Sequence, residues 1–394
     1  MKSFRLPRPD LWVGVIMIVI LMGTALVSPL YPLYQSAWAL PASRVTLLYV
    51  IYMFGALMSL LVFGRLADQL GYGRVMGAAI ALAFTGCCLS IVAPGFYLFS
   101  FARFLVGIAA SLITTSGTVA VMALAPEKSR QAVPVLTSLF ISAGFTAGPV
   151  FGGIAGQWAP EPLISAHVPS VILLMICIAA FVFVPGHPGR GGLTARSLLP
   201  RLSWTAPEHS VKFALACAIA FLCFGTFGLY ASLAPILIRT LTGLSGPIVI
   251  GLYIGIFLTA ATTFQILAGR ALPKRTASIG LVLMAVGYTI LWANLDASSL
   301  WLFATGIFIA AAAHGLCVQA STAVLYQSAG PDNRGGLTAT YWAVGYSGSI
   351  FPLLVLGWAS DQWGVKPAVT GFCMAGVALP LILALLIARR RPAR

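Results

Sequence analysis

The sequence predicts an all-α membrane protein with twelve transmembrane helices, arranged as two six-helix bundles related by a pseudo-twofold axis. Composition gives the first indication, because 60% of the 394 residues are hydrophobic and only 8% are charged, whereas soluble domains carry about 25% charged residues. The apolar residues fall into twelve long runs, and one polar segment near the middle separates six runs from six. Lipid is therefore the expected solvent for most of the chain.

Each apolar run is long enough to cross a bilayer, whose hydrocarbon core of about 30 Å needs about 20 helical residues. The predicted spans are 11–36, 45–63, 75–93, 97–124, 133–157, 168–185, 212–238, 247–269, 277–294, 299–326, 337–360 and 367–388. The first run follows basic residues but has no small-residue cleavage site, so it predicts a membrane span rather than a signal peptide.

The basic residues predict the orientation. The net charge of +15 could indicate nucleic-acid binding, but the lysines and arginines lie in short loops and at the C-terminus. With the N-terminus placed inside, the outer segments hold only three basic residues, Arg44, Arg239 and Lys366, and the remaining lysines and arginines of the loops and termini fall on the cytoplasmic side. We expect a multi-pass protein of the cytoplasmic membrane with both termini in the cytoplasm and no nucleic-acid partner.

Residues 186–211 are rich in Gly, Pro and Arg and predict a cytoplasmic central loop. They divide the chain into an N-terminal six-helix bundle, residues 1–185, and a C-terminal six-helix bundle, residues 212–394. The halves resemble each other weakly, since Gly64 and Arg65 end the second span as Gly269 and Arg270 end the eighth. Repeated halves with a midplane site are typical of transporter folds.

Reactive clusters do not appear in the sequence. The seven cysteines all lie in apolar runs without metal-ligand spacing, so we expect no metal and no cofactor. Paired carboxylates within a span, a Ser/His/Asp grouping and a phosphate loop are also missing, so we expect a protein that is not an enzyme. The alternative, a membrane-embedded enzyme or a lipid scramblase, would need a reactive cluster of this kind.

The loop after the second span, GRLADQLGYGR at residues 64–74, resembles motif A of the major facilitator superfamily, G-x-L-a-D-r-x-G-r-k/r-r. The matched positions include Gly64, Asp68, Gly71 and Arg74, and Arg130 lies in the next loop on that side. The sequence departs from the motif where it has Gln69 and Tyr72. The resemblance implies that Asp68 latches the cytoplasmic ends of the two halves, where a helix N-terminus favours a carboxylate. The alternative is a polar turn without a gating role.

The fourth span contains RFLVGIAA at residues 103–110, which resembles motif B of the same family with Val106 in place of the usual Gln. A guanidinium inside a span is expensive and is therefore a candidate functional group. Alternatively, the side chain of Arg103 reaches the outer interface.

The fifth span contains GFTAGPVFGG at residues 144–153, which matches every fixed position of motif C: Gly144, Gly148, Pro149, Gly152 and Gly153. Glycines four apart permit close helix packing, and Pro149 bends the helix. We expect this motif to shape the packing between the halves. In the family it marks proton-coupled antiporters that export drugs or metabolites. The alternative is a purely structural packing face.

The proton carrier does not follow from the resemblance. Many antiporters of the family have a carboxylate in the first span, where this chain has Thr24, Ser28, Tyr31, Tyr34 and Gln35. The ionisable groups predicted within spans are Arg103, which stays protonated, and His314, which titrates near neutral pH. Arg103, His314 and Asp68 are the coupling candidates, and the alternative for His314 is a hydrogen-bonded histidine without a coupling role.

Aromatic and amide side chains form the predicted wall of the substrate cavity, since ligand pockets are mostly apolar with a few polar groups. They are Tyr31, Tyr34, Gln35, Tyr52, Tyr230, Tyr253, Gln265, Gln319, Tyr341, Trp342 and Tyr346. Aromatic residues also populate ordinary interface belts.

Together these features predict a secondary active transporter that moves a small organic molecule by alternating access. We expect proton-coupled export of a drug or metabolite, with an importer or facilitator of a small metabolite as the alternative. The expected partners are the substrate, protons and the lipid bilayer, and we expect a monomer.

Overall fold

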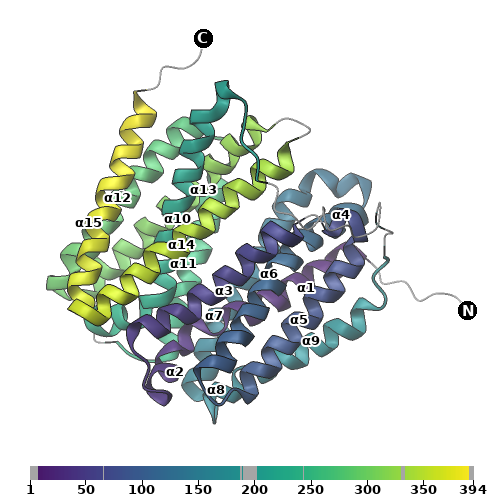
Figure 1. Ribbon diagram of the computed structural model, residues 1–394, viewed down its shortest axis with the longest axis horizontal. Helices are drawn as coiled ribbons and strands as arrows, with labels where there is room; N and C mark the ends of the chain where they lie inside the picture. Colours follow the sequence, from purple (N-terminus) through teal and green to yellow (C-terminus); the bar gives the residue numbers. More distant parts are fainter. Residues whose placement is uncertain are drawn as a thin grey trace, which may run out of the picture. The chain divides into compact units, whose positions relative to one another are not determined.

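The computed structural model describes residues 8–64, 66–186, 189, 202–242, 244–329 and 333–389. Within these ranges the backbone is helical and contains no β-strand (Figure 1). Twelve helices in the described part are long and apolar enough to cross a membrane. The predicted fold class, an all-α membrane protein with twelve spans, is confirmed.

The chain forms two compact units. Unit 1 comprises Met1–Ala39, Ile51–Pro200 and Gly246–Gly255, and unit 2 comprises Leu40–Val50, Arg201–Ser245 and Ile256–Arg394. Each unit therefore includes a short segment from the opposite half of the sequence.

Unit 1 contains nearly all of the helices from the first half of the chain. They are α1 (Pro9–Ala25), η1 (Ser28–Leu30), α2 (Tyr31–Ala37), most of α3 (Ala42–Phe63), α4 (Leu66–Leu70), α5 (Tyr72–Val92), α6 (Phe96–Leu124), η2 (Glu127–Ala132), α7 (Val133–Trp158), α8 (Pro162–Ser165) and α9 (Val168–Phe181). The first residues of α11 (Pro247–Leu267) also belong to it.

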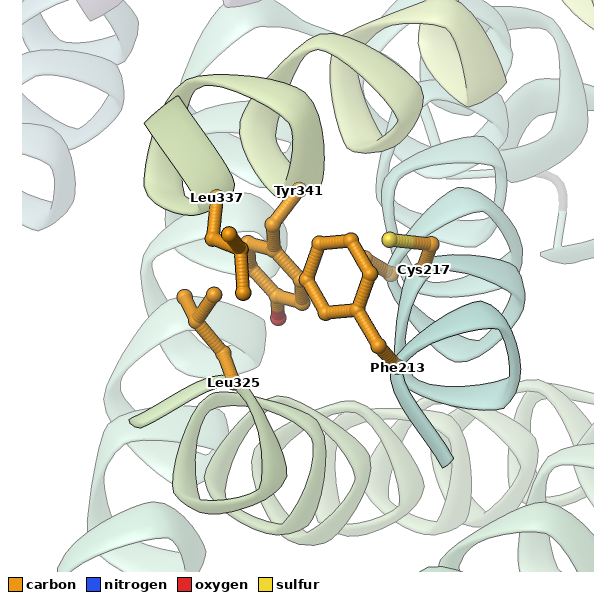
Figure 2. Close-up of a cluster of buried hydrophobic side chains, with 6 residues drawn as sticks. Phe213, Cys217, Leu325, Leu337 and Tyr341 are labelled. Atoms are coloured by element: carbon orange, nitrogen blue, oxygen red, sulfur yellow. The ribbon is translucent and has the colours of Figure 1, made fainter. Parts of the chain in front are cut away.

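Unit 2 contains the remainder of α11 and the later helices. They are α10 (Pro207–Thr242), η4 (Ala268–Arg270), α12 (Pro273–Ala297), α13 (Leu300–Ser328), α14 (Arg334–Trp363) and α15 (Val365–Ala388). Its core includes a cluster in which Phe213 and Cys217 of α10, Leu325 of α13, and Leu337 and Tyr341 of α14 point toward one another (Figure 2).

The start of α10 corrects the predicted loop. The sequence analysis began the seventh span at residue 212, but the helix begins at Pro207. Proline fits the first helical turn because its fixed φ is helical and its missing N–H would have no partner there. The last five residues of the predicted central loop, 207–211, are therefore helical. Residues 187, 188 and 190–201 of that loop lie outside the described ranges.

The first predicted span is interrupted. The sequence analysis treated residues 11–36 as one helix, but α1 ends at Ala25 and is followed by η1 and α2. Pro29 lies just beyond this break and has no N–H to donate to the carbonyl of Ala25 four residues earlier. The last carbonyls of α1 are thus available to partners outside the helix.

Two glycines bring α3 and α6 into backbone contact. A Cβ atom on Gly107 would meet the carbonyl oxygen of Tyr52, and a Cβ on Gly55 would meet the carbonyl oxygen of Phe104. Ser59 of α3 also donates a hydrogen bond to the Ile108 carbonyl at 3.3 Å. This close crossing places Tyr52 next to the turn of α6 that carries Arg103.

The motif C glycines allow α7 to pack closely against α1. A Cβ on Gly144 would lie 2.7 Å from the Cβ of Leu21, and one on Gly148 would lie 2.5 Å from the Met22 carbonyl oxygen. Gly152 faces the carbonyl of Leu26 in the same way. Gly148 itself faces α1 of the same half, whereas Pro149 and Gly153 contact α11 of the other half, since a Cβ on Gly251 would meet the Pro149 carbonyl oxygen.

A second face of the motif meets α11. A Cβ on Gly153 would lie 2.7 Å from the Pro247 carbonyl oxygen and 3.0 Å from the Cα of Ile248. These residues of α11 belong to unit 1. Motif C thus packs α7 against α1 and α11 within unit 1, and Pro149 is an internal residue of α7.

Candidate functional site

Arg103 lies in the interior of unit 1 and has only 3% of its surface exposed, so its side chain is enclosed by protein and does not extend over the surface. Its Nη1 donates a hydrogen bond to the carbonyl oxygen of Thr24 at 2.9 Å. That carbonyl is in the last turn of α1, where the helix leaves acceptors unused. The Thr24 hydroxyl donates to the Ile20 carbonyl at 2.8 Å instead.

An aromatic ring covers the guanidinium. The Cζ atom of Arg103 lies 4.8 Å from the centroid of the Tyr52 ring. A cation over an aromatic face at this distance is attracted by the negative charge of the ring face. Gly107 creates the geometry, because the close crossing of α3 and α6 brings Tyr52 to this position.

Two polar atoms at this site have no hydrogen-bond partner. The Nε of Arg103 and the hydroxyl of Tyr31 are buried and make no hydrogen bond of good geometry. Tyr31 is fully buried, and its hydroxyl lies within reach of the Arg103 charge. Buried polar groups in proteins are almost always hydrogen-bonded, so these donors require an explanation.

The charge of Arg103 has no carboxylate counterion among the described side chains. The ion pairs found there are Arg8 with Asp10, at 2.8 Å, and Lys366 with Asp296. Asp10 precedes Thr24 by 14 residues in α1, which is roughly 21 Å along the helix axis at 1.5 Å per residue. The nearest charged neighbour in this helix is therefore remote from the guanidinium.

His167 is a functional candidate that the sequence analysis missed. We expected Arg103 and His314 to be the ionisable groups within spans, but His167 lies inside the candidate span Pro162–Phe181 and is 1% exposed. The sixth span was started at residue 168, one position too late to include it. The apolar run from Pro162 to Val171, broken only by Ser165, His167 and Ser170, is the sequence feature that could have revealed it.

His167 is tied to the same cluster. Its Nε2 is 3.0 Å from the Tyr34 hydroxyl, its Nδ1 has no partner, and the charge of Arg103 reaches it. The Tyr34 ring packs on Phe99 at 4.2 Å and on Trp38 at 4.9 Å between ring centroids. These rings form an apolar wall beside the polar groups.

His314 occupies a different setting in unit 2. Its ring lies 5.7 Å from Phe257 and 6.2 Å from Phe227 between centroids, and its Nδ1 is buried without a hydrogen-bond partner. Tyr230 packs on Phe257 at 5.5 Å. The histidine is thus enclosed mainly by aromatic rings.

The predicted cavity residues are divided between the two units. Unit 1 contains Tyr31, Tyr34, Gln35, Tyr52 and Tyr253, and unit 2 contains Tyr230, Gln265, Gln319, Tyr341, Trp342 and Tyr346. Tyr341 lies in the hydrophobic cluster of unit 2 (Figure 2), and its hydroxyl is 2.8 Å from the Ser321 hydroxyl. Trp342 packs against this cluster, and Trp342 and Tyr346 both pack on Phe224, at 5.7 and 5.2 Å between ring centroids.

The motif A residues surround the short helix α4. Gly71 has φ of 85°, which glycine adopts readily, and it starts α5. Arg74 and Arg130 are exposed, as is Gly64. The side chain of Asp68, the predicted latch, lies outside the described part of the structure.

Comparison with protein sequences identifies similar transport proteins. The family model described as Major Facilitator Superfamily matches residues 13–352 and 247–394. A segment of 108 residues, 27% of this chain, is 28% identical to the organic cation transporter-like protein of Drosophila melanogaster. The match spans 19% of the length of that protein.

Solved structures share the fold over almost the whole chain. The structure of a bacterial homolog of the human lysosomal transporter Spinster matches with a TM-score of 0.75 and 13% identity over 98% of both chains. A D-xylose–proton symporter matches with a TM-score of 0.74 and 16% identity over 97% of both chains. The human organic anion transporter TETRAN gives a TM-score of 0.68 and 17% identity over 96% of this chain and 99% of that one.

Proposed function

The chain belongs to the major facilitator superfamily, and we propose from this that it is a secondary active transporter that exports small organic molecules in exchange for protons. Members of this family move small molecules across membranes. The direction of transport and the coupling to protons are proposed in addition to what membership of the family implies. The mechanism is alternating access, in which two helical bundles expose a midplane site first to one side and then to the other.

Motif C is the observation that carries the proposal of export. In this family the motif marks proton-coupled antiporters, and here each of its fixed positions is filled. Its glycines also allow close helix packing, since Gly144 and Gly148 lie against α1 while Gly153 lies against α11. Bulkier residues at these positions would prevent the contacts, so the motif is more than a coincidence of composition.

Three groups remain as proton carriers. The first span offers no carboxylate near the midplane, so a histidine or the motif A carboxylate must serve. His167 in unit 1 is buried and His314 in unit 2 is half-buried. The Nδ1 of each makes no hydrogen bond of good geometry, and Asp68 belongs to the short helix α4. Neutral imidazoles can take up and release protons near physiological pH.

We place the protein in the cytoplasmic membrane as a monomer, with both termini in the cytoplasm. The distribution of lysine and arginine supports this orientation, because cytoplasmic loops carry an excess of these residues.

Import of a metabolite is the second candidate function. The solved structures that share this fold include a D-xylose–proton symporter and a nucleoside transporter. The fold therefore serves more than one substrate class.

The test uses purified protein in liposomes that contain a pH-sensitive dye. Compounds that stabilise the protein in a thermal-shift screen are added outside at equal internal and external pH. Antiport moves protons out as substrate enters, so the lumen becomes alkaline. Symport would acidify the lumen, and a facilitator would leave its pH unchanged, so either result would overturn the proposal. Liposomes without protein serve as the control. A fully ionised substrate that cannot cross the bilayer excludes a pH change caused by passive diffusion of a weak acid.

A further inference from the structure

We propose that Arg103 and Tyr31 bind the anionic group of the transported molecule, which is a small organic anion with a single negative charge, such as a carboxylate or a sulfonate. This inference rests on the proposed function in one respect, that the chain transports small organic molecules. It adds the charge of the substrate and the residues that recognise it.

The energetics of Arg103 favour binding of an anion. A buried charge is stable only when it is paired or well hydrogen-bonded, and an arginine within a membrane span is expensive. Arg103 is 3% exposed, donates one described hydrogen bond, to a neutral carbonyl, and takes part in neither of the ion pairs found among the described side chains. A bound anion would supply a counterion that the described side chains do not.

The donors at the site match an oxyanion. The hydrogen bond from Nη1 to the Thr24 carbonyl fixes the guanidinium, while Nε makes no hydrogen bond of good geometry. The Tyr31 hydroxyl lies close enough for its oxygen to face the guanidinium, and its proton has no acceptor. A guanidinium presents parallel N–H groups that bind two oxygens of one carboxylate or similar group. The Tyr31 hydroxyl, which lies within reach of the same charge, can donate to one of these oxygens.

The count of buried cations favours a single negative charge. Among the described side chains Arg103 is the only buried lysine or arginine. One guanidinium neutralises one carboxylate or sulfonate, whereas a phosphate ester with two charges would leave an excess charge in a region of low dielectric.

The surrounding rings favour a hydrophobic body on the anion. Tyr52 covers one face of the guanidinium, and the rings of Tyr34, Phe99 and Trp38 pack together beside it. Aromatic walls with a few placed polar groups are typical of sites for small organic ligands.

The experiment measures binding rather than transport. Purified full-length protein is titrated with benzoate and benzenesulfonate as monoanions, with benzamide as the neutral counterpart, and with phenyl phosphate and chloride as alternative anions. Calorimetry gives affinities and thermal unfolding gives stabilisation. We expect both monoanions to bind and benzamide to bind at least about tenfold more weakly, as loss of a charge-assisted hydrogen bond implies.

Variants assign the binding to the site. Arg103→Gln should weaken binding of benzenesulfonate by at least about tenfold, and Tyr31→Phe by a smaller factor, because only a neutral donor is lost. Tyr31→Phe changes one hydroxyl, so it keeps the test valid if Arg103→Gln fails to fold. Arg44→Gln is the matched control, since it removes the same charge from an exposed position and should leave affinity unchanged.

Several results would overturn the inference. In the ligand titrations these results are equal affinity for benzamide and benzoate, binding of chloride alone, tighter binding of phenyl phosphate than of the monoanions, or no binding of either monoanion. In the variants, the result is wild-type affinity in both Arg103→Gln and Tyr31→Phe. The proposed function fails separately, because anion binding that depends on Arg103 but produces no proton movement in liposomes would refute proton exchange and leave the site intact.

Discussion

Replacing Gly148 with alanine should both destabilise the protein and weaken the Arg103 site. The new Cβ would lie 2.5 Å from the Met22 carbonyl oxygen and 2.8 Å from the Cβ of Ala25, whereas ordinary contacts begin at 3.4 Å. Either α1 or α7 must therefore shift by about 0.9 Å, and overpacking of this kind costs about 1–3 kcal/mol.

The displaced residues flank Thr24, whose carbonyl oxygen holds Arg103 at 2.9 Å. A shift of about 0.9 Å along that bond would lengthen it to about 3.8 Å, beyond hydrogen-bonding distance. The structure thus connects motif C to motif B through the end of α1. We expect the affinity for benzenesulfonate to fall along with stability.

The matched control is Gly371→Ala in α15, where no atom lies within 4 Å of the new Cβ. Both substitutions gain about 1 kcal/mol of helix propensity, so the difference between the two variants isolates the packing cost. Thermal unfolding in detergent, with calorimetry for the ligand, measures both effects. Equal melting temperatures for the two variants would refute the packing argument, and unchanged affinity would refute the connection to Arg103.

Three further predictions concern charged groups. Arg103→Met should leave stability unchanged or raise it while abolishing anion binding, because it removes a buried unpaired charge; a clear fall in melting temperature would instead indicate a structural role. His167→Gln and His314→Gln should each reduce flux driven by a pH gradient in liposomes, and a variant that keeps the wild-type pH dependence removes its histidine from the proton pathway. Asp68→Asn should insert at normal abundance but transport more slowly, since a charge near a helix end is lost; full transport at equal abundance would exclude Asp68 from the mechanism.

The twelve helices could be predicted from the sequence because each helix must meet the requirements for crossing a bilayer by itself. A span needs its backbone hydrogen bonds closed internally and about 20 apolar residues, and both requirements are local. The glycines of motif C were also readable as packing positions. The helix on which they pack could not be predicted, because Gly148 contacts α1, which is far from α7 in the sequence.

The site depended on details that hydrophobicity does not record. The carbonyl of Thr24 that accepts from Arg103 is free because α1 ends at Ala25, in the middle of a run that hydropathy predicts as one continuous span. His167 was missed because it sits one residue before the predicted start of its span. Whether Arg103 is buried or reaches the interface depends on the helices packed around it, and the sequence left both alternatives open.

The aromatic residues show the same limit. Tyr31 and Tyr341 are both fully buried tyrosines in the predicted cavity wall. Tyr341 packs in a hydrophobic cluster with its hydroxyl bonded to Ser321, whereas the Tyr31 hydroxyl lies unpaired beside a guanidinium. Only the three-dimensional contacts separate a core residue from a ligand-binding one.

The most direct test of the account is the release of labelled benzenesulfonate from loaded liposomes under an inside-negative potential with acid outside. Exchange of one outgoing monoanion for one incoming proton moves two charges, so a potential of about 100 mV contributes about 4.6 kcal/mol to export. We predict that the wild-type protein releases the label faster as the potential grows and that Arg103→Met releases it no faster than liposomes without protein. Release by Arg103→Met at the wild-type rate, or wild-type release that does not respond to the potential, would contradict the account.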